Sequence, residues 1–138
     1  MQLPSMRKFD NFKSNLDILS QAGERDISDE FVMGGILNKF SIQFELGWKV
    51  LRELSEHEGM EKNIGSPRGV IKAAYQYLDF MDEDTWLCML EDRNRAMHIY
   101  SGAAVRPLVE TVISRYIPEF QRMRSAIEAK YGAELSSM

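Results

Sequence analysis

Apolar residues recur every three or four positions along most of the chain, which is the period of a helix that buries one face. The pattern is longest over residues 29–58, where it predicts a helix of about 45 Å. Seven positions on one face step by four and three: Met33, Leu37, Phe40, Phe44, Gly47, Leu51 and Leu54. Such a face is typical of the seam between antiparallel helices, and we expect Phe31, Ile36 and Trp48 to widen it.

Capping and turn residues predict where the helices begin and end. Ser28 is the expected N-cap of the long helix, and Gly59 is its expected stop. Ser66 followed by Pro67 has the residue types of an N-cap and a first helical position, which predicts the start of a shorter helix. Within the long helix, Gly47 lies in the seam, where the missing side chain would let another helix approach closely.

Three further helices follow from the same period. The first covers about residues 5–22, another runs from about Asp84 to Tyr100, and the last begins near Ala103, with Pro118 expected to kink or end it. Residues 133–138 are expected to form a frayed tail. No stretch alternates with period two for long enough to form a strand. The prediction is one all-α domain over residues 1–138, with five helices, four of them packed as an antiparallel up-and-down bundle.

Charge and cysteine content narrow the classes of function. The formal net charge of -4 at pH 7 argues against a general polyanion binder, so a contact with nucleic acid has to be local or shared with a partner. The single cysteine, Cys88, cannot form an internal disulfide, and no CxxC metal site is present. No apolar run approaches the roughly 18 residues of a membrane span, and the first residues lack a signal pattern. We therefore expect a cytoplasmic protein that uses no membrane, metal or cofactor.

The stretch from Glu91 to Tyr100 gathers side chains that can act on a phosphate. A histidine transfers protons near neutral pH, and an arginine binds phosphate through paired hydrogen bonds. Arg93 and His98 therefore supply two parts of a metal-independent ribonuclease, in which the guanidinium stabilises the charge of the phosphorane. Five positions span about 140° on an ideal helix, so the pair of one chain would point apart. Two such helices facing each other in a homodimer would bring both pairs into one cleft.

Less specific interpretations of the same residues stay open. His98 could be a cation that complements the C-terminal end of its helix, as His57 does at the end of the long helix. Arg93 could pair with Glu45 or Asp92 rather than with a phosphate. These alternatives assign the charged residues to structure instead of catalysis.

The stretch Arg93-Asn94-x-x-x-His98-x-Tyr100 resembles the signature of HEPN domains. The segments 40–49, 66–68 and 86–94 resemble the nucleotidyltransferase substrate-binding protein family, which is a branch of the HEPN proteins, and the resemblance covers about Phe9 to Met123. It implies a helical bundle that is usually dimeric and that binds a minimal nucleotidyltransferase (MNT).

The resemblance also implies roles for particular residues. In related HEPN/MNT pairs the HEPN protein is a ribonuclease toxin, and the MNT protein is an antitoxin that can transfer AMP to the tyrosine of the motif. Arg93 and His98 would then be catalytic, Asn94 would support them, and Tyr100 would be the modified residue. The name of the branch implies an alternative, a non-catalytic subunit that presents a substrate to the nucleotidyltransferase. A structural helical adaptor is a weaker alternative.

Overall fold

The computed structural model describes residues 6–98 and 102–136, and no strand occurs within these ranges. Six α-helices lie in the order α1 (Met6–Leu19), α2 (Glu30–His57), α3 (Pro67–Ala74), α4 (Glu83–Ala96), α5 (Gly102–Thr111) and α6 (Ile117–Ser136). A 3-10 helix, η1 (Ser20–Glu24), follows α1, and a π-helix, η2 (Val112–Tyr116), joins α5 to α6. Because α5, η2 and α6 form one continuous helix, the five predicted helices and the all-α class are confirmed.

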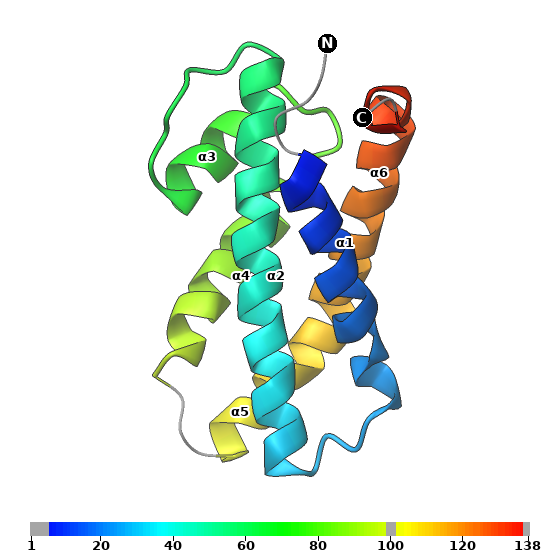
Figure 1. The fold of residues 1–138 in the computed structure, drawn as a ribbon. Coiled ribbons are helices and arrows are strands. Elements are labelled where there is room, and N and C mark those ends of the chain that lie inside the picture. The colour runs from blue at the N-terminus through cyan, green and yellow to red at the C-terminus, as the bar shows by residue number, and fades with distance from the viewer. Residues whose placement is uncertain (1–5, 99–101, 137–138) are drawn as a thin grey trace.

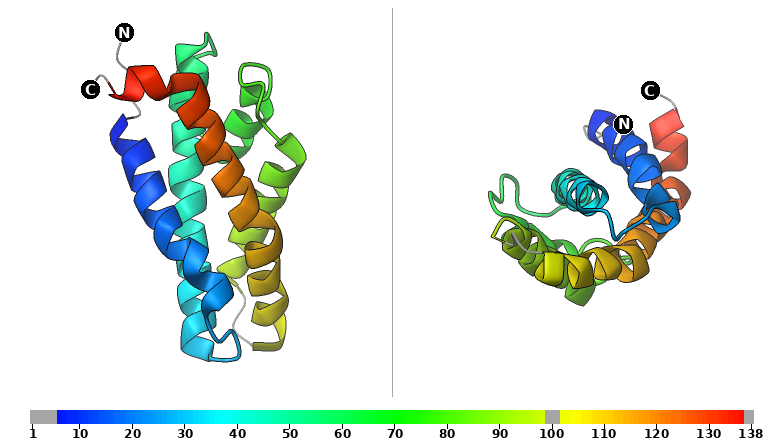
Figure 2. Two further views of the ribbon diagram at one scale, coloured as in Figure 1. Left: turned by 90° about the vertical axis from the view of Figure 1, so that its right-hand side faces the viewer. Right: turned by 90° about the horizontal axis from the view of Figure 1, so that it is seen from below.

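The long helix α2 is the centre of the bundle (Figure 1). It contacts α1, α3, α4 and α5, and the view along its axis shows the other helices in an arc around it (Figure 2). The predicted seam is buried along its whole length, from Met33 to Leu54. Among the described residues, no helix is long and apolar enough to cross a bilayer.

Two predicted positions at the start of α2 are wrong. The N-cap is Asp29, whose carboxylate accepts from the backbone N–H of Phe31 at 2.8 Å, whereas Ser28 hydrogen-bonds to Asp26. Phe31 does not widen the apolar face, since 93% of it is exposed. On an ideal helix Phe31 lies about 160° round from Met33, the first buried residue of α2, so it points away from the core. The predicted stop at Gly59, with φ of 109°, and the cap at Ser66 are confirmed.

The last predicted helix does not end at Pro118, which is one of the two outcomes expected of this proline. The π turn of η2 ends at Tyr116, two residues before the proline, and its wider winding gives room for the proline ring beside the carbonyl four residues earlier. The helix then continues to Ser136, so the described part of the predicted tail is helical. Buried Tyr131 donates to Glu58 at 3.2 Å and holds this end of α6 against the end of α2.

Gly47 allows α4 to approach α2 closely, as its place in the seam predicts. A Cβ atom added there would lie 2.7 Å from Cη2 of Trp86 and 3.2 Å from Cε2 of Phe12. Both rings are fully buried, so neither can move aside freely. A larger residue at position 47 must therefore displace the core.

Gly47→Ala should lower the free energy of unfolding by about 1–2 kcal/mol, because the overlap with Trp86 exceeds the helix propensity that alanine gains. Gly34→Ala is the matched control, since nothing lies within 4 Å of its added Cβ. That control should raise the free energy of unfolding by up to about 1 kcal/mol. Urea denaturation measures both, and a stabilised Gly47→Ala would contradict the close approach.

Candidate functional site

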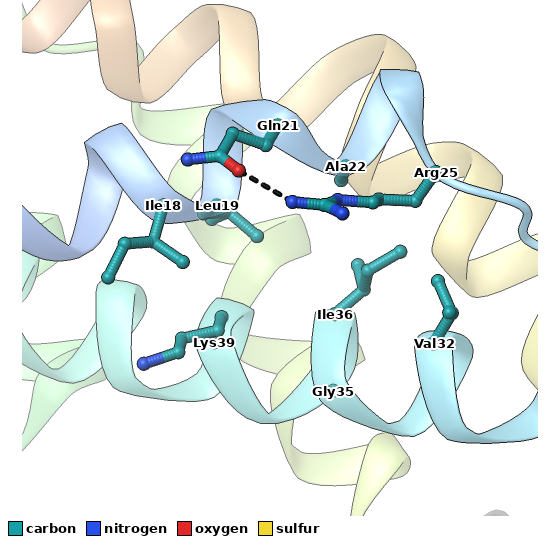
Figure 3. Close-up of a pocket in the computed structure, with 9 residues that line it drawn as sticks. All are labelled: Ile18, Leu19, Gln21, Ala22, Arg25, Val32, Gly35, Ile36 and Lys39. Atoms are coloured by element: carbon teal, nitrogen blue, oxygen red, sulfur yellow. Dashed lines mark hydrogen bonds between the residues drawn. The ribbon is translucent and has the colours of Figure 1, made fainter.

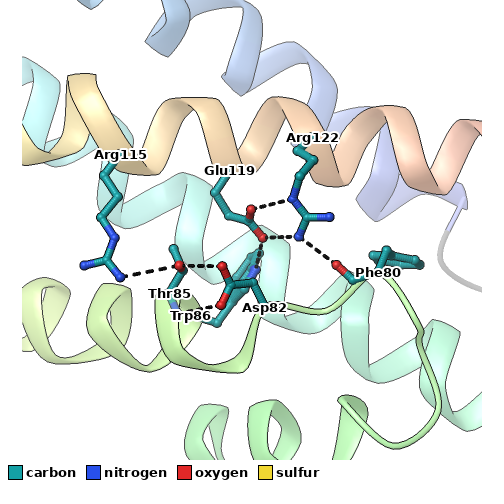
Figure 4. Close-up of polar contacts among 7 residues, drawn as sticks. All are labelled: Phe80, Asp82, Thr85, Trp86, Arg115, Glu119 and Arg122. Carbon is teal, nitrogen blue, oxygen red and sulfur yellow. Dashed lines mark hydrogen bonds and ion pairs between the residues drawn. The ribbon is translucent and has the colours of Figure 1, made fainter.

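The beginning of α4 is fixed by a polar network around Asp82, which is its N-cap (Figure 4). The carboxylate of Asp82 accepts from both the backbone N–H and the hydroxyl of Thr85, at 3.2 and 2.8 Å. The side-chain hydrogen bond from Thr85 is the main reason why the pKa of Asp82 lies below its ordinary value. Arg115, from η2, donates to the hydroxyl of Thr85 at 3.4 Å. The helix thus starts at Glu83, one residue before the predicted position, and its first turn is tied to η2.

A buried carboxylate on α6 holds the indole of Trp86. Glu119 accepts from Nε1 of Trp86 at 3.2 Å, and Arg122 donates to both oxygens of the same carboxylate at 2.7 Å (Figure 4). Arg122 also donates to the backbone carbonyl of Phe80 at 2.7 Å, just before α4. The sequence did not predict these contacts of Glu119 with Trp86 and Arg122. Their only signal was the Glu119–Arg122 spacing of three residues, which is common on exposed helix faces.

Arg93, near the end of α4, is held against α2 by Glu45. The guanidinium Nη1 donates to Glu45 at 3.0 Å, and Nε donates to the side-chain oxygen of Asn94 at 3.2 Å. The guanidinium also lies 5.2 Å from the ring centre of Phe44, which is a favourable cation–π distance. The side chain of Arg93 remains 21% exposed, and Nη2 makes no hydrogen bond to another described residue. Arg93 therefore keeps donors that can bind an anion from outside.

Glu45 is shared between several donors. It accepts from Nε1 of Trp48 at 3.1 Å and pairs with Lys49 at 3.4 Å, as well as with Arg93. Burial works to raise the pKa of the Glu45 carboxyl, but the hydrogen bond from Trp48 and the charges of Lys49 and Arg93 together lower it. Glu45 is therefore ionised at neutral pH, and Arg93 stays engaged with it.

Asp92 does not pair with Arg93, although the sequence left both acidic partners open. Its carboxylate accepts from the hydroxyl of Tyr116 at 2.5 Å and from Arg95 at 2.8 Å. Burial, followed by the hydrogen bond to the Asp92 carboxylate, raises the pKa of the Tyr116 phenol. Asp92 thus joins α4 to η2 and leaves Arg93 to Glu45.

The helix ends earlier than predicted, at Ala96 rather than Tyr100. Met97 and His98 form a turn, in which the backbone N–H of His98 donates to the carbonyl of Arg95 at 2.9 Å. The hydrogen bond of this last turn therefore joins residues three apart instead of four, as is common at helix ends. Met97, in this turn, is 66% exposed. Tyr100 lies outside the described residues.

The imidazole of His98 is exposed at the same end of α4 as Arg93. No hydrogen bond or ion pair joins these two described side chains, so one chain does not assemble them into a contact pair. Asn94 is also exposed and orients Arg93 through the hydrogen bond to Nε. The end of α4 thus presents an arginine, an amide and an imidazole, which can together bind a phosphate and transfer a proton.

The exposed end of α4 carries the Arg-Asn-x-x-x-His pattern on which the resemblance to HEPN domains rests. The chain belongs to the family described as nucleotidyltransferase substrate binding protein like, whose model matches residues 7–129. This confirms the family resemblance. No curated protein matches the chain.

Proposed function

We propose that this protein binds a nucleotidyltransferase and acts beside it as a metal-independent endoribonuclease. Membership of the family supports the partner. The observation that supports the chemistry is the exposed end of α4, where Arg93 keeps Nη2 for a phosphate and His98 is accessible. The 2'-oxygen of RNA attacks phosphorus as its proton is removed, and the P–O5' bond breaks as that oxygen is protonated. The products are a 2',3'-cyclic phosphate and a 5'-hydroxyl.

Two imidazoles perform these two proton transfers if two chains share one cleft. In that homodimer one His98 accepts the proton and its counterpart donates one, while Arg93 stabilises the phosphorane. The surface around Arg93 suits such a contact, because exposed Ile42 lies one helical turn before Glu45 and exposed Met97 one turn beyond Arg93. A second copy would cover both apolar side chains.

The engagement of Arg93 by Glu45 favours a second candidate, a non-catalytic subunit that presents a substrate to the nucleotidyltransferase. In that case the pair only stabilises the packing of α4 on α2. The two candidates differ in what happens when Glu45 loses its charge.

Glu45→Gln should increase RNA cleavage by roughly tenfold, because a bond to a charged acceptor worth about 1.4 kcal/mol no longer competes with the substrate phosphate. Glu91→Gln is the matched control, since Glu91 is an exposed acid of α4 and its removal changes the net charge equally. Initial cleavage rates on a fluorescent RNA measure the effect. The non-catalytic subunit predicts no cleavage by either variant, and a slower Glu45→Gln would show that Glu45 positions Arg93.

Tyr100 is the proposed site of control. Transfer of AMP from ATP forms a bond between the tyrosine oxygen and the α-phosphate and releases pyrophosphate. The adenylate adds bulk and one negative charge two residues from His98, where it would occupy donors needed by the RNA phosphate. We therefore expect modification to stop cleavage.

Incubation with the nucleotidyltransferase, ATP and magnesium should add the mass of one adenylate per chain and abolish RNA cleavage. Tyr100→Phe should remove the adduct, whereas Tyr75→Phe, which removes an exposed tyrosine elsewhere, should not. Intact-mass spectrometry reads both results. An adduct that persists in Tyr100→Phe places the acceptor on another residue.

A further inference from the structure

A surface groove lies between the end of α1, with η1, and the first half of α2 (Figure 3). Its volume is about 310 Å³, which is the space of a few side chains. The floor is apolar and consists of Ile18, Leu19, Ala22, Val32, Gly35 and Ile36. Ile18 is 51% exposed, so the groove leaves apolar surface open to water.

The packing of the described residues gives no reason for a glycine at position 35. A Cβ added at Gly35 or at its neighbour Gly34 meets nothing within 4 Å, and neither glycine has a positive φ. Two successive glycines weaken a helix, and here no neighbouring element needs their small size. At Gly35 the small size widens the groove and exposes the backbone of α2 to close approach.

The polar lining of the groove is cationic. Arg25 and Lys39 come from opposite walls, the first from the connection after η1 and the second from α2, and no carboxylate lines the groove (Figure 3). Arg25 donates to Gln21 at 2.7 Å, which uses one of its five N–H groups. No ion pair joins Lys39 to another described residue.

Three of the acidic residues that flank the groove in the sequence are engaged elsewhere. Asp17 pairs with Arg124 at 2.7 Å, Asp26 accepts from Ser28, and Asp29 caps α2. A chain with 21 acidic and 17 basic residues thus places two cations over an apolar floor, and neither forms an ion pair with another described residue. The matching ligand is amphipathic and acidic.

We propose that the groove receives one amphipathic helix of the partner nucleotidyltransferase. Its apolar side chains would lie on the floor between α1 and α2, and its carboxylates would face Arg25 and Lys39. A helix suits the site because the open side at Gly35 admits a close backbone, and grooves between helices bind apolar helix faces. This inference rests on the proposed function for the identity of the partner.

The test is calorimetric titration of the full chain with a minimal nucleotidyltransferase from the same organism. Gly35→Glu should weaken binding at least tenfold, because it fills the groove and places an acid against an acidic partner. Lys39→Glu should weaken it at least fivefold. Gly34→Glu is the matched control and should stay within twofold, since it makes the same change one residue outside the lining. Circular dichroism on each variant verifies the helical fold.

Each other outcome overturns the inference in a distinguishable way. If the wild type binds and all three variants bind within twofold of it, the nucleotidyltransferase uses another surface and the proposed partner stands. If the wild type does not bind the nucleotidyltransferase, the result contradicts both the proposed partner and the proposed helix in the groove. If Gly35→Glu changes the oligomeric state in light scattering and leaves the affinity unchanged, the groove is a contact between copies of this chain.

Discussion

His98→Ala should abolish RNA cleavage, with a rate loss of at least about 10³-fold, while the free energy of unfolding stays within about 0.5 kcal/mol of the wild type. The reason is that the imidazole is exposed in the turn after α4 and contributes little packing. Arg93→Ala should also stop cleavage, but it removes the contact with Phe44 and the pair with Glu45, so it lowers stability too. His98 therefore gives the cleaner test of catalysis. Cleavage of an end-labelled RNA and urea denaturation measure the two effects.

His57→Ala is the control for this experiment. His57 is the second histidine of the chain and lies at the end of α2, with its ring 6.3 Å from that of Tyr131. It should retain full cleavage. Equal activity of wild type and His98→Ala on structured and unstructured RNA would support the non-catalytic subunit. A large loss of stability in His98→Ala would assign the histidine to packing.

Trp86→Ala should lower the free energy of unfolding by about 3–5 kcal/mol, which is the largest stability effect that we expect for one substitution. The indole is fully buried and packs against Phe44 and Phe120, with ring centres 5.8 and 5.6 Å away. Its removal leaves a cavity between α2, α4 and α6. Urea denaturation measures the loss, and a change below about 1 kcal/mol would contradict the described core.

Trp86→Phe provides the matched variant, because it keeps an aromatic ring but lacks the atom Cη2 that lies closest to Gly47. In this background Gly47→Ala should cost less than in the wild type, since the overlap is removed. The coupling between the two positions would then be at least about 0.5 kcal/mol. Additive effects would show that another neighbour limits the space at position 47.

The helices could be predicted because burial imposes one period on them, but several of their ends could not. Ser66-Pro67 and Gly59 each have a residue type that suits one helix position, so they were predicted correctly. Ser28 and Asp29 both suit an N-cap, and only the contact of Ser28 with Asp26 decides between them. The end of α4 has no such residue at Ala96, so the sequence placed it too late.

The sequence could place the candidate residues of the site on one helix, but it could not predict their contacts. The spacing of Arg93, Asn94 and His98 placed all three on one predicted helix, which in the structure ends before His98. The choice between Glu45 and Asp92 as the partner of Arg93 depended on how α2 and α4 pack, and Glu45 is 48 positions away in the sequence. The hydroxyl of Tyr116 donates to Asp92, and nothing near either residue in the sequence predicts this hydrogen bond.

The π turn also sets which side of α6 faces the core. Buried Leu108, Val112, Tyr116 and Phe120 follow one another in steps of four. In a regular α-helix three such steps drift by about 120°, which would carry Phe120 off the core face. The wider winding of η2 absorbs this drift, so it acts as a single surplus residue within an otherwise continuous helix. Loss of one exposed residue such as Ser114 would restore the ordinary four-three-four spacing, whereas the same loss farther along α6 would rotate its remaining apolar side chains toward water.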